Sequence, residues 1–221
     1  MHWFCGKVVR GKIILSEEEL RHERVRRIRE GEHACITDGE GRVWLVERKK
    51  RDWEVLEEEY YPPPPPLYLA IPLIKPQRIE WAIEKGTELG VREFLLFEPI
   101  RGVGRSGKEE RWRRIIKEAA KQAHNPHFPE ISFYSSLEEV LDAGKGEVVV
   151  YGKERGGKFP EGESFLIVVG PEGGFELEEE RLLVKRKAVP VSCGWNTLRT
   201  ETAAIALLSI AVHNLKHKEE P

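Results

Sequence analysis

The stretch FLIVVGPEGGF, Phe165–Phe175, decides the fold of the larger part of this chain. Its first five residues, Phe165–Val169, form an unbroken apolar run, which is typical of a strand buried on both faces. Three glycines follow within five residues, and a helix is expected over Glu176–Lys187, with acids first and bases last as the helix dipole favours. A buried strand, a tight turn and a helix in this order predict one unit of a parallel α/β sheet.

The same alternation extends through residues 67–221. The expected strands are Leu67–Ile74, Phe94–Phe97, Glu147–Tyr151, Phe165–Val169 and Ala188–Val191, and the expected helices are Gln77–Leu89, Glu109–His124, Leu177–Arg186 and Thr200–Leu215. We therefore predict an α/β domain with a mainly parallel sheet. In such a sheet, ligands bind beyond the carboxyl ends of the strands.

Five consecutive prolines, Pro62–Pro66, mark a domain boundary, because a proline run favours a stiff polyproline II spacer. We expect residues 1–61 to form a small, mostly β domain and residues 67–221 to form the α/β domain. Within the small domain we expect a strand at Gly11–Leu15, a helix start at Ser16, and a hairpin of His33–Thr37 with Arg42–Glu47.

The composition points to a soluble cytoplasmic protein. No apolar run is long enough for a membrane span, and the first residues lack a secretory signal. The three cysteines, Cys5, Cys35 and Cys193, are odd in number and scattered, which favours a reducing compartment. The net charge is only -2, but basic residues cluster at 21–29, 48–51 and 101–117. Such patches can bind phosphates, although a solvated surface explains them equally well.

The glycine-rich turn contains a carboxylate, Glu172, at its centre. It matches neither a dinucleotide-binding motif nor a P-loop, and Glu172 would repel a phosphate. A carboxylate beside exposed amides suits a cation or an N–H donor instead. An ordinary strand-to-helix turn is the alternative.

Two further segments follow expected strands. Ser192–Ala204 follows Ala188–Val191 and opens a helix, while Tyr151–Gly157 follows Glu147–Val150. We expect the distal part of Tyr151–Gly157 to be a flexible surface loop. His213 and His217 have a spacing that suits a metal, but no third ligand is evident, so we expect no metal site.

The motifs VGPEGGF, Val169–Phe175, and LRTETAA, Leu198–Ala204, together resemble the RsmE family, which methylates N3 of a uridine in 16S ribosomal RNA. KGTELGV at Lys85–Val91 and EAAKQ at Glu118–Gln122 are similar to further family segments. The resemblance implies a SPOUT-type trefoil knot, a preceding PUA-like RNA-binding domain, S-adenosylmethionine as cofactor and a homodimer. The chain departs from the family at CGWNTLR, Cys193–Arg199, where the family often has LGPRILR.

The resemblance also implies roles for individual residues. The expected cofactor-binding residues, on loops after Val150, Val169 and Val191, are Tyr151, Gly170, Gly173, Gly174, Ser192, Cys193, Asn196, Leu198, Thr200 and Ala203. Glu172 is the candidate base, Arg199 would orient the uracil, and Glu201 would hold Arg199. Candidate RNA phosphate contacts are Arg24, Arg27 and Arg101.

Two other functions remain open from the sequence. One is the same chemistry on another RNA, such as transfer RNA. The other is a non-catalytic RNA-binding or ribosome-assembly factor that shares the fold.

Overall fold

The computed structural model describes residues 1–50, 52–101 and 109–216, and the chain forms two compact units. Unit 1 consists of Met1–Pro63 together with Lys117–Phe128. Unit 2 consists of Pro64–Ile116 and Pro129–Pro221. The chain thus leaves the small unit inside the proline run and returns to it once.

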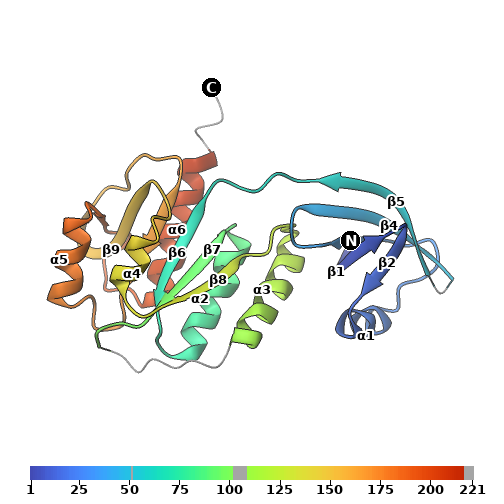
Figure 1. The fold of residues 1–221 in the computed structure, drawn as a ribbon, viewed down its shortest axis with the longest axis horizontal. Helices are drawn as coiled ribbons and strands as arrows, with labels where there is room; N and C mark the ends of the chain where they lie inside the picture. Colours follow the sequence, from blue (N-terminus) through green and yellow to red (C-terminus); the bar gives the residue numbers. More distant parts are fainter. Residues whose placement is uncertain (51, 102–108, 217–221) are drawn as a thin grey trace. The chain divides into compact units, whose positions relative to one another are not determined.

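Unit 1 contains a five-stranded sheet in the order β2-β1-β3-β4-β5. Figure 1 labels β1, β2, β4 and β5 of this sheet. Its elements are β1 (His2–Val9), β2 (Lys12–Leu15), α1 (Glu17–Arg26), β3 (His33–Thr37), β4 (Arg42–Lys49) and β5 (Asp52–Tyr60). The sequence predicted neither β1 nor β5. The predicted helix start is confirmed, because the Ser16 side chain accepts a hydrogen bond from the Glu19 backbone N–H at 3.2 Å.

The predicted hairpin of β3 and β4 is also confirmed. The two strands pair antiparallel, with Thr37 opposite Val43 next to the turn. The Asp38 carboxylate accepts the backbone N–H groups of Glu40 and Arg42 at 2.7 and 3.1 Å. These bonds fix the turn, as Asx side chains commonly do.

Unit 2 contains a six-stranded sheet in the order β11-β9-β10-β6-β7-β8. Its strands are β6 (Leu67–Pro72), β7 (Glu93–Phe97), β8 (Glu130–Tyr134), β9 (Val148–Gly157), β10 (Phe165–Val168) and β11 (Val189–Val191). Every neighbouring pair in this sheet is parallel, which confirms the predicted α/β class. All residues of β7 and β10 are buried, as their apolar runs require.

Helices cover both faces of this sheet. They are α2 (Pro76–Glu88), α3 (Glu109–Ala123), α4 (Leu137–Asp142), α5 (Leu177–Lys185) and α6 (Thr200–Lys216). Side chains of α4 and α5 share a core with Ala70 and Val168 on one face. On the other face α6 packs against β6, β9 and β10 and against α2. No helix among the described residues combines the length and apolarity that a membrane crossing requires.

Two elements of unit 2 were not predicted from the sequence, and a third was predicted wrongly. The strand β8 has five residues, of which Glu130 and Ser132 are polar, so it lacks a continuous apolar run. The helix α4 has only six residues, which is too few for a helical period to stand out. The expected surface loop in the distal part of Tyr151–Gly157 is wrong, because β9 continues to Gly157. This polar extension is held by pairing with β11, where Gly157 lies opposite Val191.

Candidate functional site

A cleft of about 490 Å³ lies in unit 2, at the carboxyl ends of β10 and β11 and along Gly152–Arg155 of β9. Parallel strands end at one edge of a sheet, so the segments that follow them meet there. The volume lies in the range of small-molecule sites. The lining residues are Gly152–Arg155, Val169–Phe175, Glu180, Val191–Gly194, Asn196–Leu198, Thr200 and Ala203.

The glycine-rich turn forms one wall of the cleft. Gly174 has a φ of +80°, which a residue with a side chain rarely adopts, and its N–H donates to the Pro171 carbonyl at 2.9 Å. A Cβ on Gly173 or Gly174 would meet no atom within 4 Å. The wall is therefore backbone with open space in front of it, which a flat or polar ligand can approach closely.

The second wall begins after β11 and is tied to the first. The hydroxyl of Thr200, the first residue of α6, donates to the Gly170 carbonyl at 2.8 Å. Thr197 donates to the Glu154 carboxylate, which fixes the same segment to β9. Leu198 and Ala203 add apolar surface to the cleft. The cleft thus combines backbone amides, an apolar patch and charged side chains from β9.

The carboxylate of Glu172 is held by an arginine that the sequence analysis missed. Arg78, in the first turn of α2, donates from Nη1 to Glu172 Oε1 at 2.5 Å. Its Nε also lies 3.9 Å from Glu201 Oε2. The only sequence signal was a basic residue shortly after a strand of the parallel sheet. Because the chain has 36 lysines and arginines, this signal could not select Arg78.

Most of the expected cofactor-binding residues line the cleft together. They are Gly170, Gly173, Gly174, Ser192, Cys193, Asn196, Leu198, Thr200 and Ala203, and Glu172 joins them. Tyr151 does not line it. Its side chain is only 2% exposed and packs in the core, with its ring 5.9 Å from that of Phe175.

Two of the expected catalytic residues lie differently from the expectation. Arg199 is exposed and is not among the lining residues. Glu201 is only 4% exposed, and the described basic side chain within 4 Å of it is Arg78. The expected contact of Glu201 with Arg199 is therefore replaced by one with Arg78.

The strand β9 supplies lining residues that the sequence analysis missed, because we expected a flexible loop there. Lys153 donates from Nζ to Glu180 Oε2 at 3.0 Å, and this hydrogen bond raises the pKa of Lys153. Burial raises the pKa of the Cys193 thiol, so this side chain is less suited to nucleophilic chemistry than an ordinary cysteine.

The three candidate RNA contacts are all exposed. Arg24 and Arg27 lie at the end of α1 in unit 1. Arg101 belongs to unit 2, where its Nε lies 3.3 Å from Glu176 Oε1. Arg51, Arg105, Lys108 and His217, from the basic clusters and the histidine pair, lie outside the described residues.

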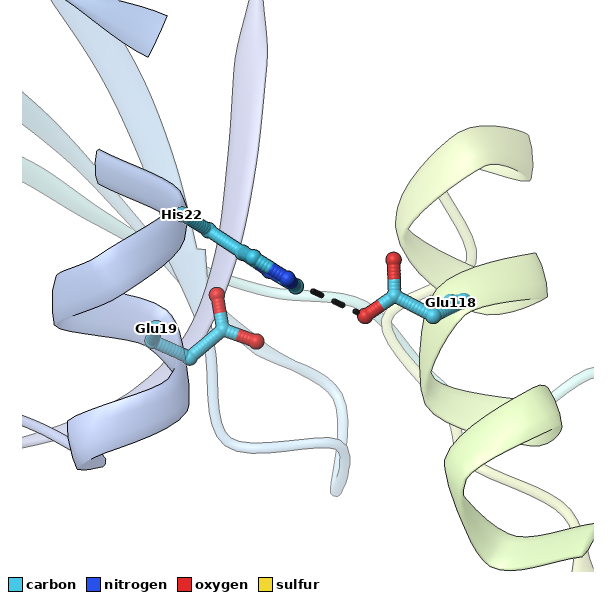
Figure 2. A group of neighbouring side chains, drawn as sticks. All are labelled: Glu19, His22 and Glu118. Atoms are coloured by element: carbon cyan, nitrogen blue, oxygen red, sulfur yellow. Dashed lines mark ion pairs between the residues drawn. The ribbon is translucent and has the colours of Figure 1, made fainter. Parts of the chain in front are cut away.

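Unit 1 contains a polar cluster, in which Glu19 and His22 of α1 lie beside Glu118 of α3 (Figure 2). Their potential ligand atoms lie within 4.8 Å of one another. However, Lys121 Nζ lies 2.8 Å from Glu19 Oε1 and 2.7 Å from Glu118 Oε1. Burial lowers the pKa of Lys121, but its hydrogen bonds to Glu118 and Glu19 outweigh this effect and raise it. The lysine is thus the cation that neutralises this cluster.

Comparison with known proteins places this cleft in context. A profile of the RNA methyltransferase domain family matches residues 62–212. The chain is 34% identical over 223 residues to the ribosomal RNA small subunit methyltransferase E of Bacillus subtilis, covering 88% of this chain and 87% of the relative.

Two solved structures are similar over nearly the whole chain. A probable rRNA-methyltransferase from Porphyromonas gingivalis has a TM-score of 0.85 and 27% identity, covering 99% of this chain and all of the other. A ribosomal RNA small subunit methyltransferase E from Neisseria gonorrhoeae, bound to S-adenosyl methionine, has a TM-score of 0.83 and 25% identity, covering 95% and 96%.

Proposed function

Since the chain belongs to the RNA methyltransferase family and, within it, to the RsmE family, we propose that it methylates N3 of a uridine in 16S ribosomal RNA with S-adenosylmethionine. The observation that carries this proposal is the cleft at the carboxyl ends of β10 and β11, beside β9. There the Glu172 carboxylate stands beside an open glycine wall, and apolar side chains are among the lining residues.

The residues of the cleft fit S-adenosylmethionine. Its adenine is flat and needs apolar contacts, which Leu198 and Ala203 offer. Its base edge and ribose need hydrogen-bond partners, and the polar residues Ser192 and Asn196 line the second wall. Gly173 and Gly174 leave the space free that side chains would fill. When bound, the cofactor supplies an electrophilic methyl group.

The side chains at the cleft suit removal of the uracil imide proton. Methylation at N3 requires that this weakly acidic proton leave, and a positioned carboxylate is a suitable acceptor. Glu172 lines the cleft and its side chain is 42% exposed, so the target uracil can reach its carboxylate. A Glu172 oxygen would accept the N3 proton and leave an electron pair on N3. That pair would take up the methyl group of a bound cofactor as its carbon–sulfur bond breaks, and the neutral thioether S-adenosylhomocysteine would be the leaving group. Arg199, which is exposed, would orient the uracil or balance its charge.

The remaining parts of the proposal concern the RNA and the assembly. We propose that residues 1–61 form a PUA-like RNA-binding domain, residues 62–66 a linker and residues 67–221 a SPOUT domain with a trefoil knot. Arg24, Arg27 and Arg101 would contact RNA phosphates. We further propose that the enzyme is a cytoplasmic homodimer.

Two measurements test the proposed function. Calorimetric titration with S-adenosylmethionine should give saturable binding, whereas a non-catalytic RNA-binding factor should give none. Transfer of labelled methyl groups is then compared on small ribosomal subunits, naked 16S RNA and transfer RNA. We expect incorporation into the ribosomal substrates and at uracil N3. Transfer RNA as the preferred acceptor would contradict the proposed substrate.

A further inference from the structure

Arg78 lies between two carboxylates that differ in their surroundings. Glu172 lines the cleft and is 42% exposed at its side chain, whereas Glu201 is 4% exposed. Arg78 itself is 21% exposed. One guanidinium group therefore serves a carboxylate at the cleft and another in the interior.

The two contacts are unequal. Arg78 forms a hydrogen bond to Glu172, but at 3.9 Å its Nε is too far from Glu201 Oε2 for one. Glu201 Oε2 is buried without a hydrogen-bond partner among the described residues. A buried carboxylate oxygen that lacks a partner is costly, so Glu201 attracts any donor that can approach. Arg78 is the charged donor already within ion-pair distance.

We propose that Arg78 is the positioning residue of Glu172, and that the buried Glu201 controls where Arg78 lies. This inference rests on the proposed function. Before the reaction Arg78 holds the Glu172 carboxylate at the cleft. A small shift of Arg78 toward Glu201 provides the missing hydrogen bond there and releases Glu172 Oε1. The released oxygen is then free to accept the N3–H of the uracil.

The side-chain chemistry explains why an arginine suits this position. The guanidinium group carries five N–H donors in a planar fork, so it can address two carboxylates at once or move between them while staying charged. A lysine ammonium is a compact charge that can neutralise one carboxylate but does not span both. Arg78→Lys is therefore expected to keep part of the function that Arg78→Gln loses.

The kinetic test compares Arg78→Gln, Arg78→Lys, Glu172→Gln and the double variant Arg78→Gln/Glu172→Gln. We expect Arg78→Gln to lower kcat about 10- to 100-fold, because a misplaced reacting group costs this much, with Arg78→Lys in between. The KM for S-adenosylmethionine should stay within about threefold of the wild type. Since Arg78 acts through Glu172, the double variant should be no slower than Glu172→Gln alone.

The matched control is Arg186→Gln. Arg186 is an arginine of the same unit that also donates to a carboxylate, that of Asp142, and neither residue lines the cleft. Its loss should leave kcat unchanged. Calorimetric titration with S-adenosylmethionine adds a readout independent of turnover, in which Arg78→Gln should bind within about threefold of the wild type.

The role of Glu201 is tested by NMR of arginine side chains. In Glu201→Gln the buried charge is lost, so Arg78 is held by the Glu172 carboxylate alone and its Nε–H resonance should shift. The kcat should fall, because Arg78 no longer has a second carboxylate toward which it can move to release Glu172. An unchanged resonance would overturn the role of Glu201.

Three results would overturn the role of Arg78. The first is an Arg78→Gln variant with wild-type kcat. The second is a loss of cofactor affinity that accounts for the whole loss of activity, which would mean that Arg78 only shapes the turn. The third is multiplication of the losses in the double variant, which would mean that it acts independently of Glu172. A wild-type protein that transfers no methyl group contradicts the proposed function itself, so the two failures are distinguishable.

Discussion

Gly156 lies where β9 passes β11. Replacing it with alanine tests whether this contact positions the loop after Val191, which forms the second wall of the cleft. A Cβ at this position would lie 2.4 Å from the Val191 carbonyl carbon and 2.5 Å from the Ser192 nitrogen. Non-bonded carbon atoms pack at about 3.5–4.0 Å, so one of the two strands must move. Both atoms are backbone, so no side-chain rotation relieves the overlap. Because Ser192 begins the second wall of the cleft, we expect that wall to be displaced.

The size of the effect follows from the cost of overpacking, which is about 1–3 kcal/mol. If all of it appears as lost affinity, the Kd for S-adenosylmethionine rises about 5- to 150-fold. Calorimetric titration measures the affinity, and thermal unfolding measures the cost to the fold. Gly157→Ala is the matched control, since its Cβ would lie 3.8 Å from the Pro190 carbonyl oxygen, an ordinary contact.

Two results would refute this reasoning. If Gly156→Ala binds the cofactor as tightly as Gly157→Ala at an unchanged Tm, the strands absorb the methyl group without strain. If the Tm falls while the Kd stays constant, the spacing of β9 and β11 does not position the loop after Val191.

Three further predictions concern other contacts. Thr200→Val removes the hydrogen bond to the Gly170 carbonyl and should weaken cofactor binding by about 0.5–1.5 kcal/mol; equal affinity in calorimetry would contradict this. Lys121→Met leaves the buried Glu19 without its cation and should lower the free energy of unfolding by about 3–5 kcal/mol, as measured by urea denaturation. A decrease below about 1 kcal/mol would contradict the role of Lys121 in neutralising Glu19. Burial, aided by Glu19, raises the pKa of Cys5 from 9.0 to about 12. The folded state thus holds this proton more tightly than the unfolded state, so the stabilisation is complete below pH 9 and is lost as the pH rises toward 12. Above pH 9, the Tm of Cys5→Ala should therefore fall less steeply with pH than the Tm of the wild type. Parallel Tm curves for the two proteins would contradict this prediction.

The local pattern of the sequence was sufficient for the fold class and for much of the cleft. Apolar runs such as Phe165–Val168 can be satisfied only by burial on both faces, which in this alternation means a parallel sheet. Because the carboxyl ends of such strands share an edge, the glycine turn and the segment after Val191 were expected at one site, where they line one cleft. Tyr151 was the exception, since an aromatic residue near a strand end suits a core and a cleft equally well.

The tertiary structure alone decided which charges meet. Arg78 and Glu172 are 94 residues apart, and Lys121 and Glu19 are 102 apart. No periodicity or motif links such distant residues, because their contact depends on how the strands are ordered in the sheet and on which helix returns to unit 1. The polar extension of β9 depends in the same way on pairing with β11. The sequence by itself therefore determined the glycine turn and its carboxylate. Which arginine holds that carboxylate was decided only by the folded chain, because the attraction between opposite charges depends on their distance in space and not on their separation in the sequence.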